Sequence, residues 1–158
     1  MSRKLLVTSV IANVALVAFL VFDLSDDALH APQPSVSAKV SALRPMAVDP
    51  TWIKSGQPQF FHAVTAEVRP AGVSSGLWVC DGPGVFEWRY GTDETVHLLE
   101  GHVEIHYLGE ILKLGPGDTA FFRAGTQALW KVEQRVYKSF ILHDPGRLSR
   151  WYRRLFGA

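Results

Sequence analysis

Three side chains of types that commonly bind metal ions stand at every second position near the middle of the chain. They are His102, Glu104 and His106, in the pattern H-x-E-x-H. On a β-strand all three would lie on one face, because successive side chains point to opposite faces. The intervening Val103 and Ile105 are apolar and must face the interior. We therefore expect the His face to point outward, toward solvent or a partner, and not to form a metal site.

A second set of chemically capable residues lies just upstream. Trp88 and Tyr90 alternate with charged residues, and Glu94 follows them closely. Alternation on a strand places the two aromatic rings on the interior face. Aromatic rings with one carboxylate suit a small ligand that is partly polar or cationic. The sequence predicts a ligand pocket here, with Trp130 as a further wall; the alternative is that Trp88 and Trp130 simply fill the core.

The composition narrows the classes of protein further. Of the 158 residues, 47% are hydrophobic and 20% charged, which is typical of one folded domain. The net charge of +1 argues against a nucleic-acid partner. The single Cys80 excludes a disulfide framework and a zinc site built from several thiolates. Without a histidine at a telling spacing, Cys80 is interpreted as a small buried side chain, and no catalytic residue is assigned.

The candidate site residues lie in or beside short apolar segments that are separated by Gly, Pro and Asp. Many short strands at this spacing predict an all-β sandwich or barrel. The expected strands are Phe60–Val68, Gly76–Cys80, Val85–Tyr90, Thr95–Glu100, His102–Tyr107, Glu110–Leu114, Thr119–Phe122, Gln127–Glu133 and Val136–Leu142.

The turns between these strands resemble those of a cupin. The first cupin motif ends with a Glu and a Gly that are separated by six residues. Glu94 and Gly101 fit that ending. The second motif begins with Gly-Asp, as at Gly117-Asp118, although Arg123 stands where the motif has Pro. The resemblance implies a double-stranded β-helix, the cupin jelly-roll barrel.

A narrower resemblance is to the small cupins related to ureidoglycine aminohydrolase and to an ethanolamine-utilisation cupin. It rests on the G-x-W-x-C block at 76–80, the F-x-W-x-Y strand at 86–90 and an Asp-Glu pair at 93–94. Those proteins also tend to have a Trp after the second motif and a Lys on the last strand, where this chain has Trp130 and Lys138. The resemblance thus implies that Lys138 joins the predicted pocket.

The chain departs from the metal-binding pattern of cupins. Many cupins hold a divalent metal with two His in H-x-H, the motif Glu and a His of the second motif. Here the H-x-H positions fall within 87–90, which contain no histidine, and the second-motif position holds Ala128. Only Glu94 remains of four ligands, and one carboxylate cannot hold a metal tightly. We expect a degenerate site with no metal and no cofactor.

The N-terminus predicts a membrane anchor. Leu5 to Phe22 contains no charged residue and would span about 27 Å as a helix. Basic residues precede it and aspartates follow it, so the positive-inside rule predicts a single-pass protein with a cytoplasmic N-terminus and a periplasmic head. A cleaved signal peptide and a buried soluble helix are the alternatives. The predicted domains are the anchor at 1–22, a Pro/Ser/Asp-rich linker at 23–50, the barrel at 51–143 and a tail at 144–158.

The tail predicts a short basic amphipathic helix. Its apolar residues recur at helical spacing with arginines on the other face, so it could meet a membrane surface or a partner, or fold back on the barrel. The contact residues expected are Arg147, Arg150, Trp151, Arg153, Arg154, Leu155 and Phe156.

The favoured function is a membrane-anchored cupin that acts as a small-molecule-binding or accessory domain. The alternatives are a structural subunit of a membrane protein complex and a ureidoglycine aminohydrolase-like enzyme on a small nitrogenous metabolite. The expected partners are accordingly the membrane, a membrane complex, an unidentified small molecule and a second copy of the chain, because small cupins often dimerise.

Overall fold

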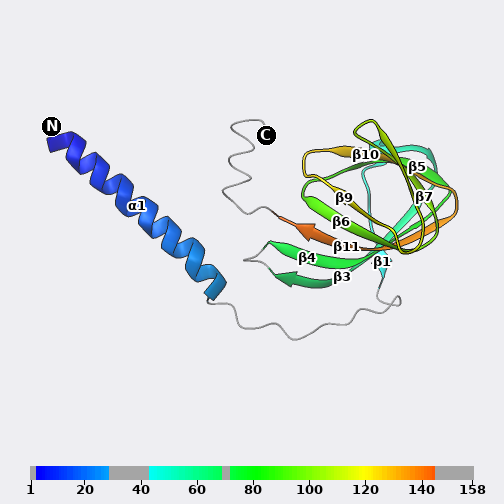
Figure 1. Cartoon of the computed structure of the whole chain (residues 1–158), viewed down its shortest axis with the longest axis horizontal. Helices are drawn as coiled ribbons and strands as arrows, with labels where there is room; N and C mark the ends of the chain where they lie inside the picture. The colour runs from blue at the N-terminus through cyan, green and yellow to red at the C-terminus, as the bar shows by residue number, and fades with distance from the viewer. Residues whose placement is uncertain (1–2, 29–42, 69–71, 145–158) are drawn as a thin grey trace. The chain divides into compact units, whose positions relative to one another are not determined.

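The computed structural model describes residues 3–28, 43–68 and 72–144 and divides the chain into two compact units, residues 1–35 and 36–158 (Figure 1). The first unit holds the helix α1, Arg3–Ala28. The second unit holds all the described strands, and its described residues 43–144 are called the head below. The predicted tail helix and its contact residues lie outside the described residues.

The prediction of a membrane span in the N-terminal helix is wrong. Among the described residues, no helix is both long enough and apolar enough to cross a membrane. The side chains described in this helix are those at 8–21. They include polar Ser9 and Asn13, whose amide donates to the Ser9 carbonyl at 2.8 Å. The predicted single-pass topology and periplasmic location of the head are therefore not supported.

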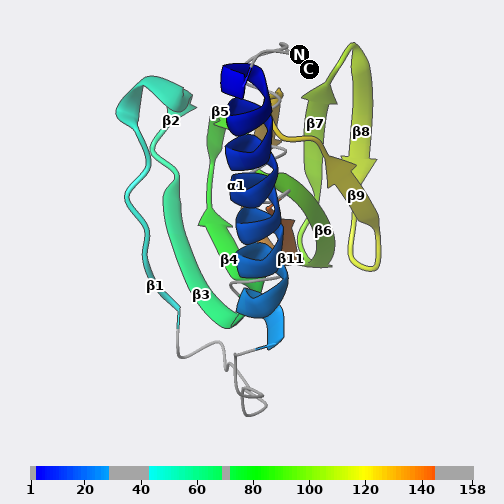
Figure 2. The ribbon, with the colours of Figure 1, turned by 90° about the vertical axis from the view of Figure 1, so that its left-hand side faces the viewer.

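The head consists of two antiparallel sheets that face each other (Figures 1 and 2). The first sheet has the order β1-β3-β4-β11-β6-β9 and the second the order β2-β5-β10-β7-β8. The strands of the first sheet are β1 (Arg44–Pro45), β3 (Gln59–Val68), β4 (Val73–Asp81), β11 (Arg135–His143), β6 (Asp93–Glu100) and β9 (Thr119–Phe122). Those of the second are β2 (Ile53–Gly56), β5 (Gly84–Arg89), β10 (Gln127–Val132), β7 (Val103–Tyr107) and β8 (Glu110–Leu114).

The head is mostly β-structure, and each of the nine predicted strands is present with ends shifted by three residues or fewer. The alternating apolar residues that predicted these strands are the residues that pack the core. Phe86, Ile105 and Trp130 are each almost completely buried between the two sheets. Burying one such side chain contributes about 2–3 kcal/mol, so the inward rows of apolar residues fix the register of the strands.

The segment before β3 was not predicted to contain strands. It holds β1, the short 3-10 helix η2 (Pro50–Trp52) and β2. Asp49 starts η2, because its Oδ1 accepts from the Thr51 backbone N–H at 2.9 Å, and Pro50 suits the first helical turn. The Met46 backbone N–H donates to the Phe60 carbonyl at 2.8 Å, which holds Met46 beside β3 and against the core.

A two-residue turn connects β7 to β8, where Tyr107 pairs with Glu110. Both turn residues have positive φ, 51° at Leu108 and 90° at Gly109. Such a turn matches the right-handed twist of a hairpin and favours Asn-Gly, so Leu108 occupies a strained position. The Leu108 side chain is also largely exposed, with no packing of its own to offset the strain.

Candidate functional site

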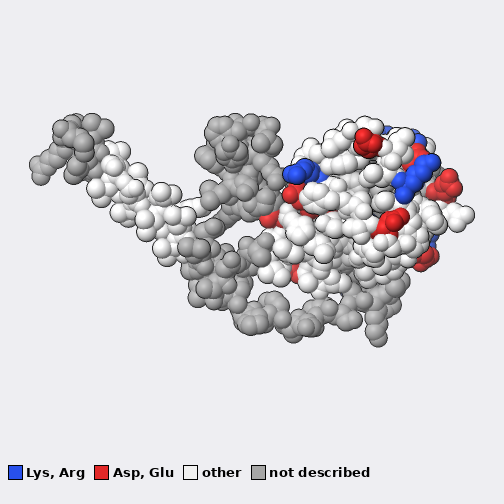
Figure 3. Space-filling model, in the orientation of Figure 1, with Lys and Arg blue, Asp and Glu red and all other residues white. Residues whose placement is uncertain are grey.

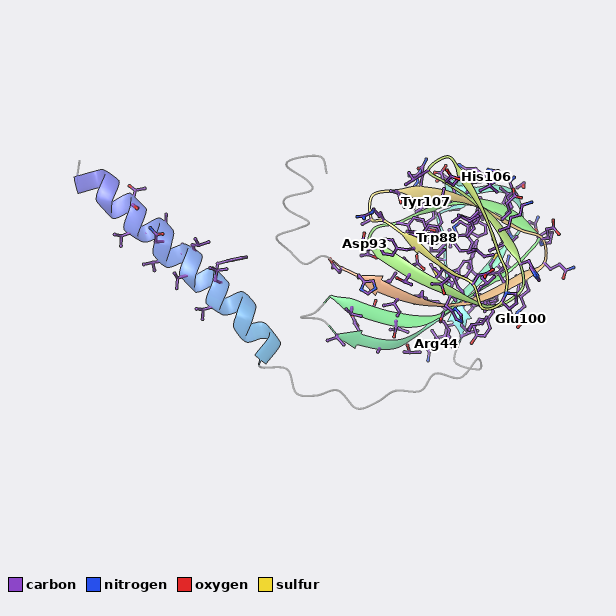
Figure 4. The ribbon with its side chains drawn as sticks, viewed as in Figure 1. Arg44, Trp88, Asp93, Glu100, His106 and Tyr107 are labelled. Atoms are coloured by element: carbon purple, nitrogen blue, oxygen red, sulfur yellow. The ribbon has the colours of Figure 1, made fainter. Side chains whose placement is uncertain are left out.

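A cavity of about 220 Å³ lies within the head. Strands of both sheets contribute to it, and Met46 closes it from the segment before η2. Trp88 on β5 lies inside the barrel in Figure 4 and forms part of the wall. The lining residues are Met46, His62, Trp78, Trp88, Arg89, Tyr90, Gly91, Thr92, Glu94, Lys138, Phe140 and Leu142.

A buried ion pair forms the polar centre of this cavity. Lys138 Nζ donates to Glu94 Oε1 at 2.6 Å, and only 3% and 7% of the two side chains are exposed. The pair joins neighbouring strands, because β11 lies beside β6 and Lys138 is opposite Leu98, four residues after Glu94. A buried pair at this distance combines charge attraction with a charge-assisted hydrogen bond, and loss of either partner would leave a buried charge uncompensated.

The ammonium of Lys138 also lies over two aromatic rings. Its Nζ is 4.9 Å from the centroid of the Trp78 ring and 5.0 Å from that of Trp130. Strand pairing brings Trp78 there, since it lies directly opposite Lys138 on β4. The two indoles and the Glu94 carboxylate, which we call the aromatic cage, thus surround one cation that belongs to the chain itself.

Tyr90 and Trp130 support the cage from the second sheet. The Trp130 indole N–H donates to the Tyr90 hydroxyl at 3.0 Å, and both residues are buried. Burial raises the pKa of Tyr90 far above its ordinary value, and the nearby charge of Glu94 raises it further. Tyr90 therefore stays a neutral phenol and fixes the orientation of the Trp130 ring.

Trp78 has an unused hydrogen-bond donor. Its indole nitrogen is the one buried side-chain N or O atom, among those of the described residues, that has no hydrogen-bond partner. Trp78 is itself 4% exposed and lines the cavity. An unpaired buried donor costs about 1–3 kcal/mol, so a hydrogen-bond acceptor placed beside it would be stabilised.

One rim of the cavity is held by a loop after β9. Ala124 N–H donates to Asp93 Oδ1 at 2.7 Å, and Gly125 N–H donates to the Tyr90 carbonyl at 2.7 Å. In the same loop, the Arg123 N–H donates to the Tyr107 hydroxyl at 3.0 Å. These bonds tie the end of the predicted second motif to β5, β6 and β7, and so fix the backbone beside Tyr90 and Glu94.

Comparisons with known proteins relate the head to the cupins. Residues 68–140 match the family described as the EutQ-like cupin domain. The similar solved structures agree on the fold: a protein of unknown function from Pseudomonas syringae pv. tomato has a TM-score of 0.59 at 24% identity, over 65% of this chain and 45% of that protein. KdgF from a Halomonas species has a TM-score of 0.53 at 15% identity, over 75% of this chain and 99% of KdgF.

The ethanolamine utilization protein Q of Salmonella typhimurium is also similar, with 18% identity and a TM-score of 0.49 over 56% of this chain and 72% of that protein. The chain spans less than half of the Pseudomonas protein. No curated protein matches the chain. The cupin resemblance predicted from the turns is thus confirmed, while the relation to ureidoglycine aminohydrolase stays a prediction.

The donor set of the head does not fit the metal that many cupins hold. Two carboxylates stand at the expected ligand positions, and both already have partners: Glu94 Oε1 accepts from Lys138, and Glu87 pairs with Arg89 and Lys54. Ala128 is buried opposite Trp88 and Tyr107, where it offers no ligand atom. The part of the chain that the structure describes contains no group of three His, Cys, Asp or Glu arranged to hold a metal. A second cation beside the Lys138 ammonium would also be repelled.

Four of the five predicted pocket residues line the cavity, namely Trp88, Tyr90, Glu94 and Lys138. The fifth, Trp130, is not part of the lining, but its ring centroid lies 5.0 Å from Lys138 Nζ. Sequence reasoning did not place Met46, His62, Trp78, Phe140 or Leu142 there. The alternation of residues along the strands could have identified two of them. Phe140 lies on the inward face of β11, the strand that bears Lys138, and Trp78 lies on the inward face of β4, which pairs with that strand.

The H-x-E-x-H residues face away from this cavity, as expected. Glu104 and His106 lie on the outer face of β7, with His106 at the outer edge in Figure 4, and His102 precedes the strand. Glu104 Oε1 accepts from His106 Nε2 at 2.6 Å and from Lys131 Nζ at 2.8 Å. These bonds lower the pKa of Glu104 to about 2, with the Lys131 contribution the larger. The motif thus forms a surface ion-pair cluster.

Cys80 is completely buried in the core on β4. Burial raises the pKa of its thiol to about 12, and the charge of Asp81 adds to the effect. The thiol is therefore protonated at neutral pH and is a poor nucleophile.

Proposed function

We propose that the cupin head is a small-molecule-binding or accessory domain that takes its ligand in the cavity around Trp88. The observation that carries the proposal is the cavity itself, with apolar rings around a single buried ion pair. Ligand sites are usually concave and mostly apolar, with a few polar groups that fix the orientation of the ligand. The Glu94–Lys138 pair and the Trp78 indole supply those groups here.

The volume limits the size of the ligand. Drug-sized ligands occupy pockets of about 300–1,000 Å³, and this cavity measures about 220 Å³. A molecule of only a few heavy atoms fits best. The fixed hydrogen bonds of the loop at 123–125 also favour a preformed site, so that little ordering of the backbone opposes binding.

A cavity-filling variant tests the proposal. Leu142 lines the cavity, whereas its neighbour Ile141 lies on the other face of β11 and is exposed. We expect small polar fragments to shift the indole N–H signals of Trp78 and Trp88 in NMR spectra of the head. Leu142→Trp should abolish these shifts, and the matched control Ile141→Trp should keep them.

Fragments that shift the same signals equally in Leu142→Trp and in the wild type would contradict the proposal. So would a complete lack of binding by the wild type across a broad set of small acids, amides, alcohols and amines. Thermal melts of both variants verify that the barrel remains folded.

A further inference from the structure

The cation in the aromatic cage is part of the chain, and this limits which ligands the cavity accepts. Aromatic rings with a carboxylate are the usual setting for an organic cation. In this head the Lys138 ammonium already lies 4.9 and 5.0 Å from the Trp78 and Trp130 ring centroids and 2.6 Å from Glu94 Oε1. An external ammonium group would meet a neutralised carboxylate and a repelling charge.

Three basic or indole side chains of the lining offer hydrogen-bond donors, beside the polar side chains of His62, Tyr90, Thr92 and Glu94. The Trp78 indole N–H is buried without an acceptor. The Lys138 ammonium has three N–H bonds, of which one is directed to Glu94. Arg89 adds a second basic side chain to the lining, although its guanidinium also pairs with Glu87 at 3.1 Å. Such a site is complementary to a ligand oxygen that accepts hydrogen bonds.

The other lining side chains define the rest of the ligand. Met46, Trp88, Phe140 and Leu142 surround the polar centre with apolar surface. A short hydrocarbon body would bury its surface there, at about 25 cal/mol for each Å² removed from water.

We infer that the cavity binds a small molecule with an apolar body and an oxygen acceptor at its polar end, a carboxylate or a neutral carbonyl, and that Lys138 excludes organic cations from the aromatic cage. The inference rests on the proposed function and specifies its ligand class. It also assigns a selectivity role to Lys138, since the same cage without the lysine would be a site for cations.

Three probes of matched size test this inference with the full chain: butyrate, butyramide and n-butylammonium. The measurement is the NMR titration of the tryptophan indole signals. We expect butyrate or butyramide to bind the wild type and to shift the Trp78 indole signal downfield, as a new hydrogen bond does. n-Butylammonium should bind at least about tenfold more weakly, because repulsion replaces the cation–π attraction.

The decisive variant is Lys138→Met, which keeps an unbranched side chain one atom shorter and removes its charge. We expect it to gain at least about tenfold in affinity for n-butylammonium, which then takes the place of the lysine ammonium beside Glu94. The double variant Glu94→Gln/Lys138→Met should not gain this affinity. The double variant has no uncompensated buried charge, so it can be measured in place of Lys138→Met if that single variant unfolds.

Each outcome separates the two proposals. If n-butylammonium binds the wild type as tightly as butyramide, or if folded Lys138→Met gains no affinity for it, the inference is wrong and the proposed function stands. If the double variant gains the same affinity as Lys138→Met, the carboxylate plays no part and the inference is also wrong. Binding that persists unchanged in Leu142→Trp contradicts the proposed function instead.

Discussion

Glu104 on the outer face of β7 is where a single charge has the clearest consequence for stability. Its carboxylate accepts from Lys131 and His106, and Lys113 Nζ lies 3.9 Å from Oε2. The hydrogen bonds and charges of Lys131 and His106 lower its pKa from 4.5 to about 2. A lowered pKa means that folding favours the ionised form, so the stabilisation is present above the ordinary pKa and is lost as the pH falls toward the lowered one.

We predict that the wild-type head loses stability between about pH 4.5 and pH 2 in a way that Glu104→Gln does not. Melting temperatures measured across this range provide the test. Glu110→Gln on the neighbouring β8 removes the same charge outside the cluster and should retain the wild-type pH dependence. Parallel curves for wild type and Glu104→Gln below pH 4.5 would show that the cluster contributes nothing.

At the same scale, the sequence predicted the polar centre of the site better than its walls. Glu94 was found from its spacing to Gly101 in the resembled cupin motif, and Lys138 from the Lys that the resembled small cupins carry on their last strand. Met46 was not found, because it reaches the cavity through one backbone hydrogen bond to Phe60 in a segment without any strand pattern. The cation–π contacts of Lys138 were also beyond prediction, because they depend on the pairing of β4 with β11 across 60 residues of chain.

At the scale of elements, alternation of apolar and polar residues predicted the strands because one face of each sheet is buried. This explains why β5, β7 and β10 were placed almost residue by residue. The two-residue β1 and the four-residue β2 carry too few residues to show alternation. The helix α1 was expected from its apolar run, but the membrane role assigned to that run was not supported.

The hairpin between β7 and β8 offers a stabilising substitution. We predict that Leu108→Asn raises the free energy of unfolding by up to about 1 kcal/mol, because Asn tolerates the positive φ that strains Leu. Leu108→Ala is the matched control, since it also removes the exposed side chain but keeps the unfavourable φ. Urea unfolding of the three proteins gives the comparison. An Asn variant no more stable than the Ala variant would mean that the turn carries no such strain.

At the scale of the whole molecule, acidic and basic side chains are interspersed on the face of the head seen in Figure 3. This agrees with the net charge of +1. The buried charge of Glu94 is also balanced within the chain, because Lys138 neutralises it.

We therefore predict that metal removal leaves the head unchanged. Dialysis against EDTA should shift neither its melting temperature nor its affinity for the probe that binds best, because the cation that stabilises Glu94 is covalently attached. Readdition of Mn²⁺, Ni²⁺ or Zn²⁺ should have no effect either. A rise of several degrees on adding one equivalent of metal, absent from Glu94→Gln, would contradict this.

The position of β11 has a consequence for how the protein is made. β11 is the last described strand along the chain, yet it lies between β4 and β6 in the middle of its sheet. During synthesis, β4 and β6 leave the ribosome with their facing edges open and with Glu94 still lacking its counter-ion. The head can complete its fold only when β11 emerges, because β4 and β6 have no partner between them until then. A nascent chain stalled before residue 135 should remain sensitive to protease, and one extended well past residue 143 should resist it.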